Sequence, residues 1–298
     1  MPLRIVQSKQ NARLKELRRA LASPGRSGNG GAGAEAGIEG RNLLVEAMRA
    51  RLAIRTVLVA REAERQLDGL ALPAETEVLV VPEAVLASAL ATEAPQAIAA
   101  LVEPPDWNWR DLLEPSDGRA PLLLILAGIQ DPGNLGTILR SGEAFGATGV
   151  VSLPGTVHAW NPKAVRASAG STFRLPLIAA SVEECIARLH KENVTVWTTA
   201  ARGAEPADSA HLEGASALII GNEGNGVPPD LAAQADGSIT IPCPGAVESL
   251  NAAVAASILL YEASRQRAAG SAAASRPSRK NKNAAKVGHP GFLTGDRR

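Results

Sequence analysis

Three short segments in the second half of the chain carry residue types that could bind a ligand and stabilise charge. The first holds Asn134 and Arg140, the second holds Glu223 in a glycine-rich loop, and the third holds Ser249 and Asn251. Amides, a carboxylate and a hydroxyl can orient a polar substrate, and a guanidinium can bind phosphate or stabilise a developing oxyanion. The scattered histidines and the two cysteines show no spacing typical of a metal site.

Each segment follows a run of residues that is typical of a buried or half-buried strand. These runs are Leu122–Ala127, Ala217–Ile220 and Ser238–Ile241. Further strands are expected at Gly149–Leu153, Leu175–Ile178 and Thr195–Thr198, with helices between most of them. Ligands bind beyond the carboxyl ends of the strands in an open parallel sheet, so that edge is where we expect the three segments.

The helices that follow these strands should position the polar side chains. Asn134 is predicted to cap one helix, and Ser249 is predicted to cap the last helix, which should run to Arg265. Arg140 falls off the apolar stripe of its helix, and side chains in helices lean toward the N-terminus. Its guanidinium is therefore expected to reach back toward Asn134.

Each segment taken alone also has a plain structural interpretation. Asn134 could only cap a helix and Arg140 could only face solvent, while Glu223 could lie on a tight turn. The third segment could be an ordinary capped helix. A dinucleotide-binding enzyme is a further alternative, but the glycines of residues 221–226 have the wrong order for its fingerprint, and no P-loop lysine follows.

In their order and spacing, the three segments together resemble the SpoU/TrmH family of the SPOUT methyltransferase superfamily. The resemblance covers about residues 122–261. It rests on Asn-x-Gly-x-x-x-Arg at 134–140, Gly-Asn-Glu-Gly-x-Gly at 221–226, and Ile-Pro…Ser-Leu-Asn at 241–251. It implies an S-adenosylmethionine-dependent RNA 2′-O-ribose methyltransferase with a trefoil-knotted α/β domain, in which 242–251 threads through a loop. A catalytically inactive RNA-binding SPOUT protein and a base-methylating SPOUT enzyme are the alternatives, and the completeness of all three motifs argues against the first.

The resemblance also implies roles for single residues and a homodimer that uses the alanine-rich face of 252–258. Arg140 is viewed in this family as a base, but a guanidinium hardly ever loses its proton in a protein. We therefore expect Arg140 to bind an RNA phosphate and to stabilise the developing alkoxide. The catalytic residues would be Asn134, Arg140, Glu223, Ser249 and Asn251, and the cofactor would contact Thr199, Ala200, Gly221, Ile241 and Leu250.

The whole chain is predicted to divide into a substrate-binding α/β domain (1–104), a linker (105–119), the methyltransferase domain (120–265) and a disordered basic tail (266–298). In the first domain, Ile38-Glu39-Gly40-Arg41 and Pro95-Gln96 resemble the family's ribosomal-protein-like RNA-binding domain. This extra domain favours ribosomal RNA over transfer RNA as the substrate. Helices are expected at 11–22, 42–51, 82–91 and 95–102, strands at 56–60 and 77–81, and a flexible loop at 23–40.

The charge is concentrated at the two ends of the chain. Residues 1–20 carry six Lys or Arg against one Glu, and residues 265–298 carry nine against one Asp, although the formal net charge is only +1. Basic ends on a neutral body indicate phosphate contacts, with solvated tails as the alternative. The candidate RNA-binding residues are Arg13, Lys15, Arg18, Arg19, Lys163, Arg166 and Arg174.

The composition sets the remaining limits. A chain of 298 residues, 45% of them hydrophobic, can bury a sizeable core. The amino terminus lacks the apolar run of a signal peptide, and no stretch reaches the length of a membrane span. Two cysteines without a framework spacing fit a reducing compartment, so a cytoplasmic location is expected.

Overall fold

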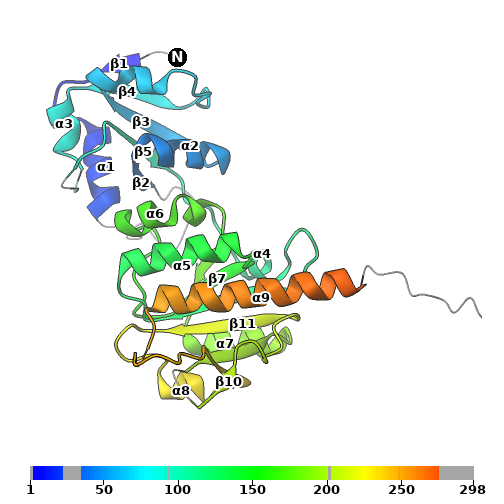
Figure 1. The fold of residues 1–298 in the computed structure, drawn as a ribbon. Coiled ribbons are helices and arrows are strands. Elements are labelled where there is room, and N and C mark those ends of the chain that lie inside the picture. The colour runs from blue at the N-terminus through cyan, green and yellow to red at the C-terminus, as the bar shows by residue number, and fades with distance from the viewer. Residues whose placement is uncertain are drawn as a thin grey trace, which may run out of the picture.

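Two α/β domains in contact with each other make up the part of the chain that the structure describes. The computed structural model describes residues 3–22, 35–90, 92, 94–200, 203–247 and 249–274 (Figure 1). Each domain is built on its own sheet, with five strands in the first and seven in the second. The predicted α/β class is confirmed.

The first sheet is mixed and has the order β1-β4-β3-β5-β2. Strands β1, β4 and β3 are parallel, whereas β5 runs antiparallel to both β3 and β2. The strands are β1 (Leu3–Ile5), β2 (Ala36–Glu39), β3 (Ile54–Ala60), β4 (Glu77–Val81) and β5 (Ile98–Val102). The accompanying helices are α1 (Ala12–Ala22), α2 (Arg41–Arg49), α3 (Glu83–Ala87) and the 3-10 helix η1 (Arg61–Leu67).

Two predictions for this domain were wrong. The predicted helix at 95–102 is instead strand β5, whose five residues are all buried between β3 and β2. The predicted loop at 23–40 contains strand β2, while residues 23–34 lie outside the described residues. Gly37 lets β2 pass close to α1, because a Cβ at this position would lie 2.8 Å from Leu21.

The second sheet has the order β10-β12-β9-β11-β6-β7-β8, and every neighbouring pair is parallel. At its centre Ile219 pairs with Ile125, and Gly221 pairs with Ala127. The strands are β6 (Leu122–Ala127), β7 (Gly149–Ser152), β8 (Leu177–Ala179), β9 (Thr195–Thr199), β10 (Glu205–Pro206), β11 (Ser216–Gly221) and β12 (Gly237–Thr240).

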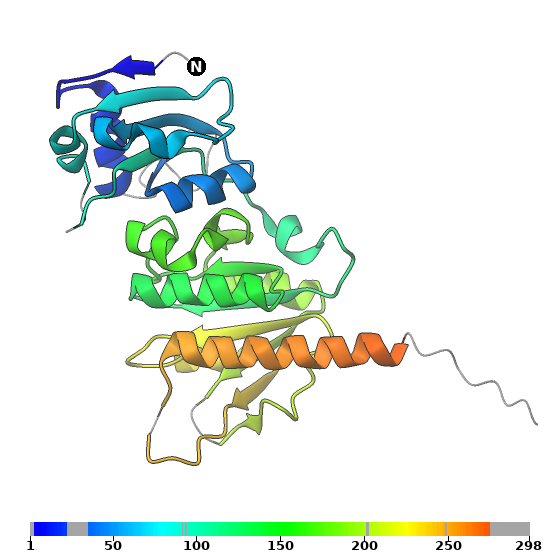
Figure 2. The ribbon, with the colours of Figure 1, turned by 45° about the horizontal axis from the view of Figure 1, so that its top comes forward.

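Helices cover both faces of this sheet, so its central strands are apolar on both sides. Along β6, Leu122, Leu124 and Leu126 pack toward α5 and α9, whereas Leu123 and Ile125 pack toward α4 and α7. Figure 2 shows α5 and α9 side by side on one face. The helices are α4 (Trp109–Leu113), α5 (Pro132–Ala144), α6 (Pro162–Ser168), η2 (Ser171–Phe173), α7 (Val182–Lys191), α8 (Pro229–Ala232) and α9 (Ala252–Ala274).

Two predicted boundaries need correction. The predicted linker contains α4, and the buried Leu112 of this helix packs closely over Gly149. The last helix continues past Arg265 to Ala274. Arg267 explains the extension, because its guanidinium donates to backbone carbonyls that include those of Leu212 and Pro121, at 2.9 and 3.0 Å. Residues 275–298 of the predicted tail lie outside the described residues.

The segment formed by α6 and η2 joins the two domains. Val165 and Phe173 belong to this segment but are buried in the core of the first domain, where Trp160 stacks on Phe173 with ring centroids 5.4 Å apart. Arg174 follows directly and forms ion pairs with Glu143 of α5 and Glu46 of α2. The domains therefore share core residues and a bridging cation.

Candidate functional site

The three polar segments lie at one edge of the second sheet, as predicted. Strands β6, β11, β9 and β12 are parallel neighbours, so their carboxyl ends meet at this edge. The first segment follows β6, the second follows β11, and the third follows β12. The fold thus gathers residues that are more than one hundred positions apart in the chain.

Asp131, and not Asn134, caps α5. The Asp131 carboxylate accepts a hydrogen bond of 2.8 Å from the Asn134 backbone N–H, and Pro132 occupies the first turn. The same carboxylate pairs with Lys163 at 3.1 Å. The prediction that Asn134 caps this helix was wrong. Because Asp131 satisfies the helix end, the Asn134 side chain is available for other contacts.

A chain of side-chain hydrogen bonds connects the three segments. Asn134 Nδ2 donates to Glu223 Oε1 at 2.9 Å, and Asn251 Nδ2 donates to Asn134 Oδ1 at 3.0 Å. Both amide groups are thereby fixed in orientation. Their nitrogen and oxygen positions are mutually consistent, since each amide donates in one direction and accepts in the other.

Glu223 is the terminal acceptor of this chain. Its carboxylate also faces the backbone N–H groups of Gln130 and Asp131, both at 3.4 Å. Burial raises the pKa of Glu223, but the hydrogen bond from Asn134 and those from backbone N–H groups outweigh it and hold the pKa below its ordinary value. The side chain is therefore ionised at neutral pH and contributes a fixed negative charge.

Asn251 caps α9 and closes the hydrogen-bond chain at the same time. Its Oδ1 accepts from the backbone N–H groups of Ala253 and Val254 at 2.9 and 3.2 Å, directly at the start of the helix. The prediction that Ser249 caps this helix was wrong, because the helix begins three residues later. Ser249 is exposed in the preceding loop.

The loop at 221–226 depends on Gly221, which was predicted, and on Asn222, which the sequence analysis missed. A Cβ on Gly221 would lie 2.2 Å from the backbone carbon of Gly226, so only glycine fits there. Asn222 Oδ1 accepts from the N–H of Gly224 at 2.8 Å, and its Nδ2 donates to the carbonyl of Gly128 at 2.7 Å. An asparagine directly before a glycine-rich loop is typical of such a side-chain turn, and this signal could have identified it.

Arg140 lies on α5, is exposed, and forms no hydrogen bond or ion pair with any residue that the structure describes. The amide of Asn134 bonds to Glu223 and Asn251 and not to the guanidinium. We expected the Arg140 guanidinium to reach toward Asn134, but the structure has no hydrogen bond between these two side chains. As far as the described residues go, the donors of Arg140 remain available to a ligand.

The residues predicted to contact a cofactor surround the ends of β9, β11 and β12. The Thr199 hydroxyl donates to the carbonyl of Ile219 at 2.8 Å, and the N–H of Ala200 donates to Ile239 at 3.0 Å, so both residues serve the sheet. Ile241 and Leu250 are half-buried, and Ile241 packs against the core. Both residues offer apolar surface to a ligand.

The candidate RNA-binding residues fall into two groups. Lys15, Arg18 and Arg19 are exposed on α1, and Arg18 donates only to a backbone carbonyl. The others already have carboxylate partners: Arg13 pairs with Glu16 and Glu77, Lys163 with Asp131, Arg166 with Glu39, and Arg174 with Glu143 and Glu46.

Neither a membrane span nor a metal cluster occurs in the part of the chain that the structure describes. None of its helices is long and apolar enough to cross a bilayer. Its acidic residues, histidines and cysteines form no group of three or more that could hold a metal ion.

Comparison with known proteins gives two family matches. Residues 121–261 match the SpoU rRNA methylase family, and residues 38–107 match an RNA 2′-O ribose methyltransferase substrate-binding domain. The Bacillus subtilis 23S rRNA (guanosine(2553)-2′-O)-methyltransferase RlmP is 34% identical over 224 residues, which are 75% of this chain and 86% of that protein. The Xanthomonas campestris 23S rRNA (guanosine-2′-O-)-methyltransferase RlmB is 40% identical over 52% of this chain and 63% of its own length.

Solved structures are similar over both domains. The rRNA methyltransferase from Sinorhizobium meliloti with bound AdoMet has a TM-score of 0.75 and 28% identity, over 88% of this chain and 98% of that chain. The SpoU methyltransferase AviRb from Streptomyces viridochromogenes in complex with the cofactor AdoMet has a TM-score of 0.74 and 27% identity, over 87% and 99%.

Proposed function

Because this chain belongs to the SpoU rRNA methylase family and is an S-adenosylmethionine-dependent RNA 2′-O-methyltransferase, we propose that it methylates a ribose in 23S ribosomal RNA. Two of its relatives are named as 23S rRNA 2′-O-methyltransferases. The observation that carries the proposal is the hydrogen-bond chain from Glu223 through Asn134 to Asn251, which assembles all three motifs at one sheet edge.

The residues present fit the cofactor. Gly221 lets the backbone at 226–227 pack directly against the end of β11, which fixes the shape of this loop, and the half-buried Ile241 and Leu250 provide apolar surface. Together with Thr199 and Ala200 they are the residues that we propose contact S-adenosylmethionine. When bound, this cofactor supplies a methyl group on a positively charged sulfur. The predicted knot, in which 242–251 threads through a loop, remains a prediction.

The reaction needs alignment and charge stabilisation more than covalent catalysis. The ribose 2′-oxygen would take the methyl group that the bound cofactor supplies, the sulfur would be left neutral, and the 2′-hydroxyl proton would leave to solvent. Arg140 would stabilise the negative charge that grows on the oxygen and bind the adjacent RNA phosphate. The ribose and the cofactor would meet at the edge that is held by Asn134, Glu223 and Asn251. The exposed Ser249 would contact either the ribose or the cofactor.

The test is the single-turnover rate with 23S rRNA from cells that lack the gene. Arg140→Ala is expected to lower the rate by about 100-fold or more, since removing one such donor typically has that effect. Arg140→Lys should keep the positive charge but lose the forked geometry of the guanidinium. Its rate should therefore lie between that of the wild type and that of Arg140→Ala. Cofactor affinity should stay unchanged in both variants. A rate in Arg140→Ala equal to that of the wild type would remove this residue from catalysis.

We also propose that two copies of the chain associate through α9. Val254, Ile258 and Tyr261 are spaced to share one helix face, and they are 47%, 38% and 56% exposed. The alanines of the predicted dimer face, Ala252, Ala253 and Ala256, are instead buried in the core of their own protomer, so that part of the prediction was wrong. Ile258→Asp should convert a dimer to a monomer in light scattering after gel filtration, whereas Lys191→Asp on α7 should not.

Within this proposal residues 1–104 bind the RNA, residues 120–265 carry out the transfer, and the protein works in the cytoplasm. Free cysteines at positions 185 and 243 support a reducing compartment. Lys15, Arg18 and Arg19, together with the basic residues of α6, would contact RNA phosphates without reading its sequence.

A further inference from the structure

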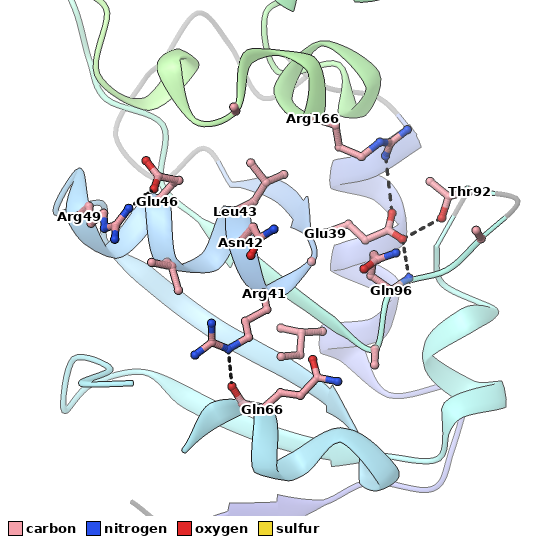
Figure 3. Close-up of a pocket in the computed structure, with 16 residues that line it drawn as sticks. Glu39, Arg41, Asn42, Leu43, Glu46, Arg49, Gln66, Thr92, Gln96 and Arg166 are labelled. Carbon is pink, nitrogen blue, oxygen red and sulfur yellow. Dashed lines mark hydrogen bonds and ion pairs between the residues drawn. The ribbon is translucent and has the colours of Figure 1, made fainter. Parts of the chain in front are cut away.

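A cavity lies between the two domains, away from the methyl-transfer edge. Its volume is about 1050 Å³, and it is lined by α2, by Thr92, Ala94 and residues 96–98, and by Arg166 of α6 (Figure 3). It brings together the Glu39-Gly40-Arg41 and Pro95-Gln96 motifs, which are far apart in the sequence. The Gln96 N–H donates to Glu39 Oε1 at 2.8 Å, and the Thr92 hydroxyl donates to the same oxygen at 2.8 Å.

The two carboxylates at this cavity are already neutralised. The Glu39 side chain is only 2% exposed, and its second oxygen lies 3.7 Å from Arg166. Glu46 pairs with Arg49 at 2.6 Å and with Arg174 at 2.7 Å. Neither acid therefore presents a free negative charge to a ligand.

Arg41 is the arginine of this lining that has no carboxylate partner among the described residues. Its Nε donates to the backbone carbonyl of Gln66 at 2.8 Å, and no carboxylate of the described residues lies within ion-pair distance of it. Arg41 is the first residue of α2, and Gly40, with φ at +101°, leaves this helix end without a side-chain cap. The partial positive charge of the helix end adds to that of Arg41.

Amide side chains complete the lining. Asn42, Gln66 and Gln96 line the cavity, and no side-chain hydrogen bond engages their amides among the described residues. Each amide offers both donors and an acceptor, which is what the edge of a nucleobase requires. Among the described residues, a cation without a carboxylate partner thus lies beside amides without side-chain partners, and this combination matches a nucleotide better than it matches an apolar ligand.

Helix α6 connects this cavity to the methyl-transfer edge. Lys163 pairs with Asp131, the cap of α5, and Arg166 lies one turn further along α6, at the cavity. A strand of RNA that follows α6 would meet one cation after another between the two places. In Figure 3 Arg166 extends from α6 toward Glu39, while Arg41 extends from α2 toward Gln66.

We propose that this cavity binds one unstacked nucleotide of the substrate RNA, distinct from the nucleotide that is methylated. Its phosphate would contact Arg41 and the start of α2, and its base edge would bond to Asn42 and Gln96. The substrate is then an RNA loop or bulge and not a continuous duplex. This inference rests on the proposed function and adds a second point of recognition to it.

The test measures binding of deproteinised 23S rRNA from cells that lack the gene, without cofactor. Arg41→Gln should weaken binding about 10-fold, as expected for one charge-assisted contact, and lower the slope of log affinity against log salt by about 1. Gln96→Ala should weaken binding with an unchanged salt slope. Arg110→Gln, an exposed arginine on α4 outside residues 1–104, is the matched control and should bind as the wild type does.

Chemical probing of the same RNA gives a second measurement. The wild type should protect the Watson–Crick edge of one unpaired nucleotide that is not the methylated one, and Arg41→Gln should lose that protection. Wild-type affinity in Arg41→Gln, or protection confined to duplex, would overturn the proposal. Separate calorimetry with S-adenosylmethionine keeps the two proposals distinguishable, because failure to bind it would refute the methyl transfer and leave the RNA measurements valid.

Discussion

Replacing Gly221 by alanine tests the geometry of the site most directly. The added Cβ would lie 2.2 Å from the Gly226 carbon and 2.3 Å from the Val227 nitrogen. Both are backbone atoms, so no side-chain rotation relieves the overlap. Ordinary contact begins at 3.4 Å, so the two backbone segments must separate by about 1 Å.

That displacement is large compared with the tolerance of the hydrogen-bond chain. In the sequence, Glu223 lies between the two displaced segments. Its Oε1 accepts from Asn134 Nδ2 at 2.9 Å, and a further ångström of separation would break this hydrogen bond. A misplacement of about 1 Å can lower a catalytic rate by about 100-fold. The overpacking itself should cost about 1–3 kcal/mol of unfolding free energy. We therefore expect Gly221→Ala to fold, with weakened cofactor binding and a rate about 100-fold lower.

The assay combines calorimetry with S-adenosylmethionine, single-turnover methylation and thermal unfolding. Gly214→Ala is the matched control, because it precedes the same strand at the opposite edge and its Cβ would meet nothing within 4 Å. This control should match the wild type in all three measurements. Wild-type cofactor affinity and rate in Gly221→Ala would refute the reasoning, since the tight approach would then have no part in the site.

Three further predictions concern single side chains. Asn251→Asp keeps the helix cap but loses the donor to its neighbouring amide, so the melting temperature should hold while the methylation rate falls; a proportional loss of both would contradict this. Arg174 pairs with Glu46 and Glu143. Burial raises the pKa of both carboxyl groups, but the hydrogen bonds that they accept outweigh burial and hold each pKa below its ordinary value. Their stabilisation is present above the unfolded-state pKa and is lost as the pH falls through the folded values, so Arg174→Gln should lower stability by about 1–2 kcal/mol at pH 7 and by little near pH 3. The exposed Arg265→Gln should have almost no effect at either pH, and equal acid sensitivity of both variants would count against the bridge. Burial raises the pKa of the Cys185 thiol to about 12, so iodoacetamide should label the exposed Cys243 in the native protein at pH 8 and Cys185 only after unfolding, as mass spectrometry can check.

The sequence predicted the second domain better than the first. Its central strands, β6 and β11, are apolar runs that end at Gly128 and Gly221, and that pattern leaves little ambiguity about a buried parallel sheet. Residues 98–102 are also apolar throughout, but a short run of this kind cannot be distinguished from a buried helix by periodicity, and Pro95 favoured the helix. Only the pairing with β3 and β2, which are distant in the chain, decides the outcome.

At the site, the motifs brought Asn134, Glu223 and Asn251 together but did not predict which residues cap the helices. Asp131 and Asn134 are both good caps, as are Ser249 and Asn251, and composition cannot rank them. The structure assigns the cap to Asp131 and Asn251 because their oxygens reach the first free N–H groups. Asn222 was missed because its role depends on a carbonyl contributed by another loop, at Gly128.

The burial of Val165 and Phe173 in the neighbouring domain's core has a consequence for how a target is selected. Because the two domains share core side chains, we expect them to resist pivoting, so that the distance from the proposed RNA-binding surface to Arg140 stays constant. We expect such an enzyme to select its nucleotide by the distance along a folded RNA from a fixed anchor. An inserted base pair between anchor and target would then shift methylation to a neighbouring ribose or abolish it, even with every contacted base left intact.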